Sequence, residues 1–163
     1  MRDLLSWLAT SPYATWVNEG GGWPIALTIH AFGMAIVVGF MVVISLRLMG
    51  LFRTIPYSTL NYLLPFIWVA IVFQFISGFT LWMTKPAAYL ADGMFEIKFT
   101  LVIVACIVMA YVHGTIRREA AGWDAAGKVS PRGVKLVGAT CLLWIAVTIG
   151  GRLTAYLGSL YLQ

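Results

Sequence analysis

The sequence alternates between four long apolar stretches and short polar segments. The first stretch, Trp23–Leu51, has no charged side chain between Pro24 and Leu46, and His30 is its only readily titratable group. About 20 apolar residues cross a hydrocarbon core of ~30 Å, so this stretch predicts a membrane-spanning helix with an imidazole inside it. The same criterion predicts three further spans, at about 62–84, 95–116 and 134–160.

Four spans joined by short connections predict an all-α fold, an integral membrane antiparallel four-helix bundle. Residues 23–163 would form this transmembrane domain, after a short interfacial N-terminal segment at 1–22. Ser11 followed by Pro12 is typical of a helix start, so we expect one or two short helices at the membrane interface. We expect short loops at 87–96 and 118–133, with Trp123 in the second loop as an interfacial anchor.

Composition and charge agree with a membrane protein. The chain is 61% hydrophobic and 10% charged, whereas soluble domains average about 25% charged residues. The net charge of +5 comes from basic residues that flank the spans, so the lipid bilayer is the expected partner and no nucleic acid is expected. By the positive-inside rule both termini face outward, because seven basic residues lie by the first and third connections: Arg47, Arg53, Arg117, Arg118, Lys128, Arg132 and Lys135.

The two histidines lie in spans that cross the membrane in the same direction. His30 is ~9 Å from the outer end of its predicted helix, and His113 is about one turn from the inner end of its own. The two are therefore roughly 20 Å apart along the membrane normal and cannot ligate one iron or metal ion within one chain. An ionisable residue inside a membrane indicates a functional site. The alternative is that each histidine only hydrogen-bonds a neighbouring helix.

Each histidine has neighbours suited to b-type haem, which needs an axial nitrogen or sulfur ligand and cations for its propionates. Lys98 and Arg152 would hold the outer propionates, and Arg117 or Arg118 the inner ones. Arg152 has the alternative of reaching to the membrane surface. With one histidine in each layer, we expect a homo-oligomer or a larger membrane complex. Methionine sulfurs offer further ligands for haem or for copper, three outside and one inside: Met34, Met83, Met94 and Met109.

Short motifs in the spans follow one another in an order that resembles a family of small bacterial four-span integral membrane proteins. They are IHAFGMAIVVG, LRLMG, FEIKFTLV, HGTIRR, WDAAG, SPRG and LLWIAVTIGGRLTAY. The resemblance implies the bacterial inner membrane but no particular activity. It also implies that several residues are family-type positions: His30, Arg47, Lys98, His113, Trp144 and Arg152. A looser likeness, by analogy of fold alone, exists to membrane b-type cytochromes and to copper-resistance membrane domains.

The sequence therefore predicts a membrane-embedded b-type haem protein that passes electrons or anchors a redox partner. His30 would be the outer axial ligand and His113 the inner one. Two alternatives stay open. One is a copper-handling membrane protein that uses His30, Met34 and either Met83 or Met94. The other is a cofactor-free structural accessory subunit of a respiratory or photosynthetic complex.

Overall fold

The computed structural model describes the backbone of residues 2–160 and the side chains of residues 3–153. Its regular structure is entirely helical, with no strand in the described part. Four helices are long and apolar enough to cross a membrane, which confirms the predicted all-α four-helix bundle of a membrane protein. They are α3 (Gly22–Leu48), α4 (Leu64–Met83), α6 (Gly93–Ala126) and α7 (Pro131–Leu160).

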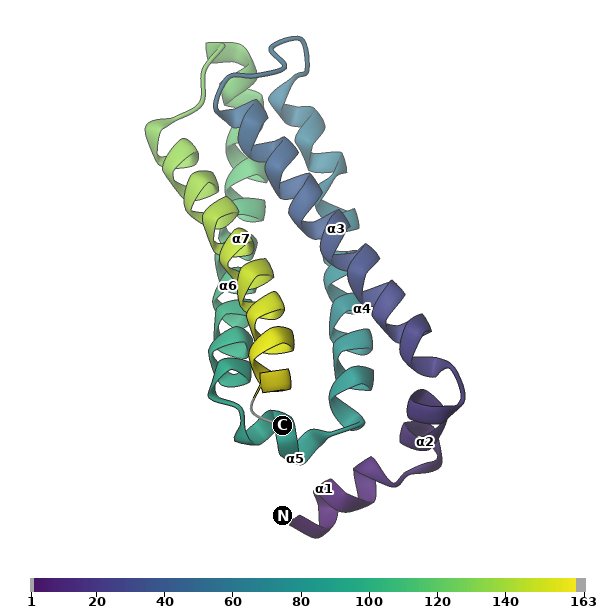
Figure 1. Cartoon of the computed structure of the whole chain (residues 1–163). Coiled ribbons are helices and arrows are strands. Elements are labelled where there is room, and N and C mark those ends of the chain that lie inside the picture. Colours follow the sequence, from purple (N-terminus) through teal and green to yellow (C-terminus); the bar gives the residue numbers. More distant parts are fainter. Residues whose placement is uncertain (1, 161–163) are drawn as a thin grey trace.

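The four long helices run alternately up and down the bundle (Figure 1). The main contacts join α3 to α4, α6 to α7 and α3 to α7. One end of the bundle, called the η1 end below, carries the short 3-10 helix η1 (Tyr57–Tyr62), which packs on α6. The opposite end, called the α5 end, carries three short helices: α1 (Arg2–Ala9), α2 (Pro12–Glu19) and α5 (Pro86–Ala91).

Helices α1 and α2 are the short helices expected before the first span. Pro12 begins α2, and the Ser11 hydroxyl oxygen accepts a hydrogen bond from the Ala14 backbone N–H at 3.2 Å, as a helix N-cap does. The Tyr13 and Thr80 hydroxyls lie 3.0 Å apart, which ties α2 to α4. An interfacial location stays a prediction, and it fits the large side chains that these helices leave exposed: Leu4, Trp7, Tyr13 and Trp16.

Helix α6 extends further than predicted at both ends, and three expectations are corrected here. Residues 118–126 continue the helix, which ends at Gly127 with a φ of 66°. Four alanines in this segment favour helix over loop. Trp123 is 5% exposed and packs edge-to-face on Tyr57, so it lies inside the protein and not at its surface. At the other end, α5 and the start of α6 replace most of the loop predicted at 87–96.

Four side chains hold the η1 end together, and we call them the η1 cluster: Arg47, Tyr57, Trp123 and Asp124. The guanidinium carbon of Arg47 lies 3.6 Å from the centre of the Tyr57 ring. Arg47 is only 5% exposed, and its Nε donates a hydrogen bond to the carbonyl oxygen of Ile55. The Asp124 carboxylate accepts hydrogen bonds from the first two backbone N–H groups of η1. The cluster therefore fastens the chain between α3 and α4 to the end of α6.

Gly33 allows α3 and α4 to approach closely. A Cβ at Gly33 would lie 3.1 Å from Cγ of Gln74 and 3.3 Å from the carbonyl oxygen of Ala70. We expect Gly33→Leu to lower the free energy of unfolding by about 1–3 kcal/mol, because the larger side chain forces the helices apart. Thermal unfolding in detergent measures this loss. Gly39→Leu on the same helix is the control, since nothing lies within 4 Å of its Cβ position. Equal losses in the two variants would contradict the prediction.

Candidate functional site

The His30 ring lies on α3, towards the α5 end, and packs against α4. Its Nδ1 is 3.0 Å from the hydroxyl oxygen of Ser77. Ser77 donates its own hydrogen to the Phe73 carbonyl oxygen at 2.6 Å. The ring also covers Gly78, where a Cβ would be 3.2 Å from Cε1 of the imidazole. A serine followed by a glycine thus gives the imidazole both a polar partner and the space that it occupies.

These contacts favour one tautomer of His30. A serine hydroxyl has one hydrogen, and Ser77 uses it on a backbone carbonyl, so Ser77 accepts a hydrogen bond from Nδ1–H of His30. The neutral ring therefore keeps a lone pair on Nε2. Histidines that ligate metals share this arrangement, in which one ring N–H donates to an acceptor and the other nitrogen is free to bind.

Other polar residues lie in the same part of the bundle as this imidazole, and we call the group the polar layer: His30, Gln74, Ser77 and Lys98. Lys98 comes from α6, and its charge acts on His30. Its Nζ lies 3.7 Å from the Cβ position of Gly151 on α7, so the glycine leaves room for the lysine side chain. Within the described residues no carboxylate pairs with Lys98. Both amide atoms of Gln74 are buried without a hydrogen-bond partner.

The polar layer is therefore incompletely satisfied. A buried polar group without a partner costs free energy, and most such groups in native proteins have a protein, water or ligand partner. Here an amide, an unpaired ammonium group and a nitrogen lone pair lie in one layer of the bundle. A ligand that contains both a metal ion and a carboxylate could bind the His30 nitrogen through the metal and the Lys98 and Gln74 side chains through the carboxylate.

His113 makes the opposite hydrogen bond. The indole N–H of Trp68 donates to Nδ1 of His113 at 2.7 Å, and an indole can only donate. The neutral His113 ring then carries its proton on Nε2, so neither nitrogen has a free lone pair. The bond joins α4 to α6. These two helices have few other contacts with each other, because α4 packs mainly on α3 and α6 packs mainly on α7. This geometry agrees with the alternative given in the sequence analysis, in which the histidine only forms a hydrogen bond to a neighbouring helix.

The two histidines also lie at different levels of the bundle. Their partners on α4, Ser77 and Trp68, are nine residues apart, which corresponds to ~14 Å along a helix axis. This spacing of the partners is shorter than the roughly 20 Å expected between the histidines. It still prevents the two imidazoles from ligating one metal centre within one chain.

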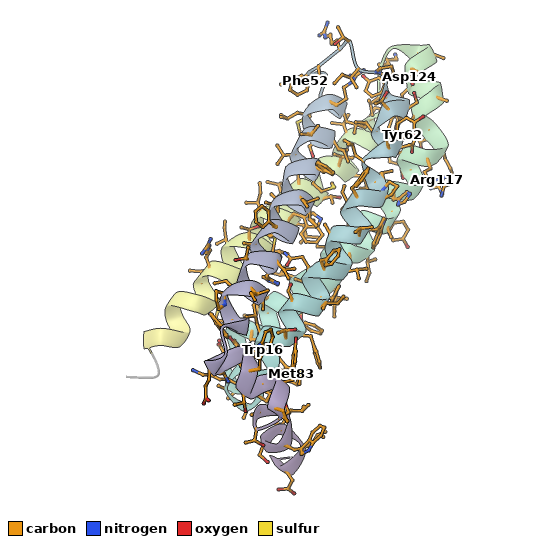
Figure 2. The ribbon with its side chains drawn as sticks, turned by 90° about the vertical axis from the view of Figure 1, so that its right-hand side faces the viewer. Trp16, Phe52, Tyr62, Met83, Arg117 and Asp124 are labelled. Atoms are coloured by element: carbon orange, nitrogen blue, oxygen red, sulfur yellow. The ribbon has the colours of Figure 1, made fainter. Side chains whose placement is uncertain are left out.

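The predicted propionate-binding arginines have exposed side chains. Arg152 follows Gly151 on α7 and is exposed, as expected for a cation that reaches towards a membrane surface. Arg117 and Arg118 are exposed on α6, and Arg117 projects away from the bundle (Figure 2). Of the four predicted cations, only Lys98 is partly buried, while the charge of the exposed Arg117, four residues after His113 on α6, acts on His113.

The methionines predicted as ligands are spread over several levels. Met34 lies one turn from His30, and its sulfur accepts a hydrogen bond from a threonine of α7 at 3.7 Å. Met109 is fully buried in the apolar core. Met83 lies six residues beyond Ser77, or ~9 Å further towards the α5 end, at the same end as α2 (Figure 2). Met94 belongs to the first turn of α6. No group of three His, Cys, Asp or Glu able to hold a metal occurs among the described residues.

Reasoning from the sequence missed the hydrogen-bond partners that separate the two histidines. Gln74 and Ser77 are polar residues of the second predicted span, and the pair Ser77-Gly78 is a usable signal for a ring packed on a helix. Trp68 carries no such signal, because tryptophan is common in membrane helices.

No family model matches the sequence, and neither a curated protein nor a solved structure matches it. The resemblance to a four-span bacterial family therefore stays a prediction. The fold and the site define a class of protein: all-α, with four helices that can span a membrane and a polar layer in the half of the bundle nearer the α5 end.

Proposed function

We propose that the protein is a membrane-embedded redox protein that holds one b-type haem, with Nε2 of His30 as an axial ligand. The observation that carries the proposal is the hydrogen bond from His30 Nδ1–H to Ser77, because it orients the ring and leaves Nε2 able to bind iron. A bound haem supplies one-electron transfer. Of the two haems predicted from the sequence, we propose only the one at His30, because the lone pair of His113 Nδ1 already accepts a hydrogen bond from the Trp68 indole.

The rest of the polar layer fits the carboxylate edge of a haem. Haem propionates need cations, and Lys98 is a partly buried cation without a carboxylate partner among the described residues. The unpaired amide of Gln74 can donate a hydrogen bond to the same group. The layer contains a single histidine, so we propose that a second axial ligand comes from another chain, in a homo-oligomer or a larger redox complex.

We further propose that the protein lies in a bacterial inner membrane with the η1 end facing the cytoplasm. The support is the clustering of basic residues at that end, which is the pattern of cytoplasmic loops. The termini and the haem would then lie towards the periplasmic side. The residues concerned are Arg47, Arg53, Arg117, Arg118, Lys128, Arg132 and Lys135.

A visible spectrum of the purified protein tests the proposed function. We expect a Soret band, bands that sharpen on reduction with dithionite, and at most one haem per chain. Bound copper without a Soret band would instead support the copper-handling alternative, with His30 and Met34 as its nearest ligands. Protein with neither pigment nor copper, after expression with sufficient haem and copper, would contradict both and favour the cofactor-free accessory subunit.

Lys98→Met should weaken haem retention and lower the reduction potential of the haem that remains. The potential falls because a nearby positive charge stabilises the reduced, more negative state of the haem. Lys85→Met is the matched control, since Lys85 is an exposed lysine at the same end of the bundle. Redox titration of both variants measures the shift. An unchanged potential in Lys98→Met, or an equal shift in Lys85→Met, would show that Lys98 does not face the haem.

A further inference from the structure

A second polar site lies at the η1 end, away from the polar layer. It is a cavity of about 610 Å³ between α6 and the start of α7. Three cationic side chains, two side chains with hydroxyl groups and apolar surface line it, among them Arg118, Arg132, Lys135, Tyr111, Thr115 and Leu136. Neither His30 nor His113 contributes to this cavity.

The three cations of the cavity have no anionic partner. No carboxylate lines the cavity, and within the described residues no ion pair engages Arg118, Arg132 or Lys135. The nearest acidic residue in sequence, Glu119, accepts a hydrogen bond from the Ser130 hydroxyl at 3.1 Å instead. Three like charges around one hollow repel each other, so a bound anion would stabilise this arrangement.

Arg118 is placed to meet an anion at the level of the membrane. Its Nη1 lies 3.2 Å from the Cβ position of Gly114, one helical turn nearer the middle of the bundle. The guanidinium therefore folds back along α6 and does not extend past the end of the helix. The absence of a side chain at Gly114 is what permits this, because a Cβ there would crowd the guanidinium.

The apolar part of the cavity identifies the kind of anion. The ring of Tyr111 lies seven residues before Arg118 on α6, nearer the middle of the bundle, and Leu136 adds apolar surface beside Lys135. The cations lie towards the η1 end of both helices. Basic pockets between membrane helices bind the headgroups of anionic lipids. We infer that the cavity binds the headgroup of an anionic glycerophospholipid from the leaflet at the η1 end, with its acyl chains lying along α6 and α7.

Lipid retention by the full-length protein tests this inference. Protein purified in mild detergent is mixed with phosphatidylglycerol or phosphatidylcholine, and bound lipid is counted by native mass spectrometry. We expect phosphatidylglycerol to bind at least about tenfold more tightly than phosphatidylcholine, because each cation near an anionic headgroup adds attraction. Glycerol phosphate, the soluble form of the same headgroup, should not compete at equal concentration. Effective competition would show that the cavity takes a soluble phosphate and would overturn the lipid assignment.

Charge-removing variants show whether the cavity is responsible. The triple variant Arg118→Gln, Arg132→Gln and Lys135→Gln should lose the preference for phosphatidylglycerol. The double variant Arg53→Gln and Lys128→Gln removes exposed charges at the same end outside the cavity, and it should keep the preference. If the triple variant does not fold, Arg118→Gln alone should weaken the preference by about threefold or more. Equal preference in the cavity variants and in the control would overturn the inference.

Discussion

His30→Ala is expected to remove all haem from the purified protein while the bundle stays folded. The imidazole is the only group in the polar layer with a free nitrogen lone pair, so its loss leaves the iron without a protein nitrogen ligand there. The cost to the fold is small, because the variant loses one hydrogen bond to Ser77, typically worth ~0.6–2 kcal/mol between membrane helices. The ratio of Soret absorbance to protein measures haem content, and circular dichroism measures helicity.

His113→Ala is the matched control for this prediction. It removes the other imidazole and breaks the hydrogen bond from Trp68, so it should lower stability by a similar amount and leave the pigment unchanged. Addition of imidazole to His30→Ala during haem loading should restore part of the absorbance by supplying the missing ligand. Pigment lost in His113→Ala and kept in His30→Ala would reverse the assignment. Equal loss in both would support two haems, as first predicted from the sequence.

Arg47→Ala should destabilise the η1 end by about 3 kcal/mol. The substitution removes a cation stacked on Tyr57, worth about 2 kcal/mol when desolvated, and a charged hydrogen bond to the Ile55 carbonyl, worth about 1.5 kcal/mol. Arg47 is 5% exposed, so little of this interaction is screened by water. The melting temperature should fall on the order of 10 °C. Limited proteolysis should cut the connection between α3 and η1 first.

Two further substitutions separate the stacking of Arg47 from its charge. Arg47→Lys keeps the charge but loses the planar guanidinium, so it should recover only a small part of the stability. Arg53→Ala removes an exposed arginine of the same connection, whose Nε donates to the Gly50 carbonyl at 3.3 Å, and should change the stability by less than about 0.5 kcal/mol. Comparable melting temperatures for Arg47→Ala and Arg53→Ala would show that the η1 cluster does not stabilise the bundle.

The membrane spans were predictable because bilayer thickness dictates the length of an apolar run. The helix ends that extend beyond those apolar runs could not be predicted in the same way. Residues 118–126 combine alanines, which favour helix, with charged side chains and Gly122, which do not. Their contact with η1 supports the helix, because Asp124 caps η1 and Trp123 packs on Tyr57. Local composition does not show a partner that lies about 66 residues away in the sequence.

The candidate site was predictable in its residue types but not in its geometry. His30, His113 and Lys98 stand out because polar groups in a membrane are costly. What distinguishes the two histidines is the partner of each Nδ1, a hydroxyl for His30 and an indole for His113. Those partners depend on which faces of α3, α4 and α6 meet. Hydropathy does not show this, because all sides of these helices are apolar.

The tautomers of the two histidines provide the most direct test, and nitrogen-15 NMR can observe them. The chain contains two histidines, so selective labelling of a cofactor-free preparation without a histidine tag gives one set of ring signals for each, assigned through His30→Ala and His113→Ala. We predict protonated Nδ1 and unprotonated Nε2 for His30, and the reverse for His113. The same tautomer at both positions, or the two tautomers exchanged, would contradict the distinction between a ligand-ready histidine and one that only joins two helices.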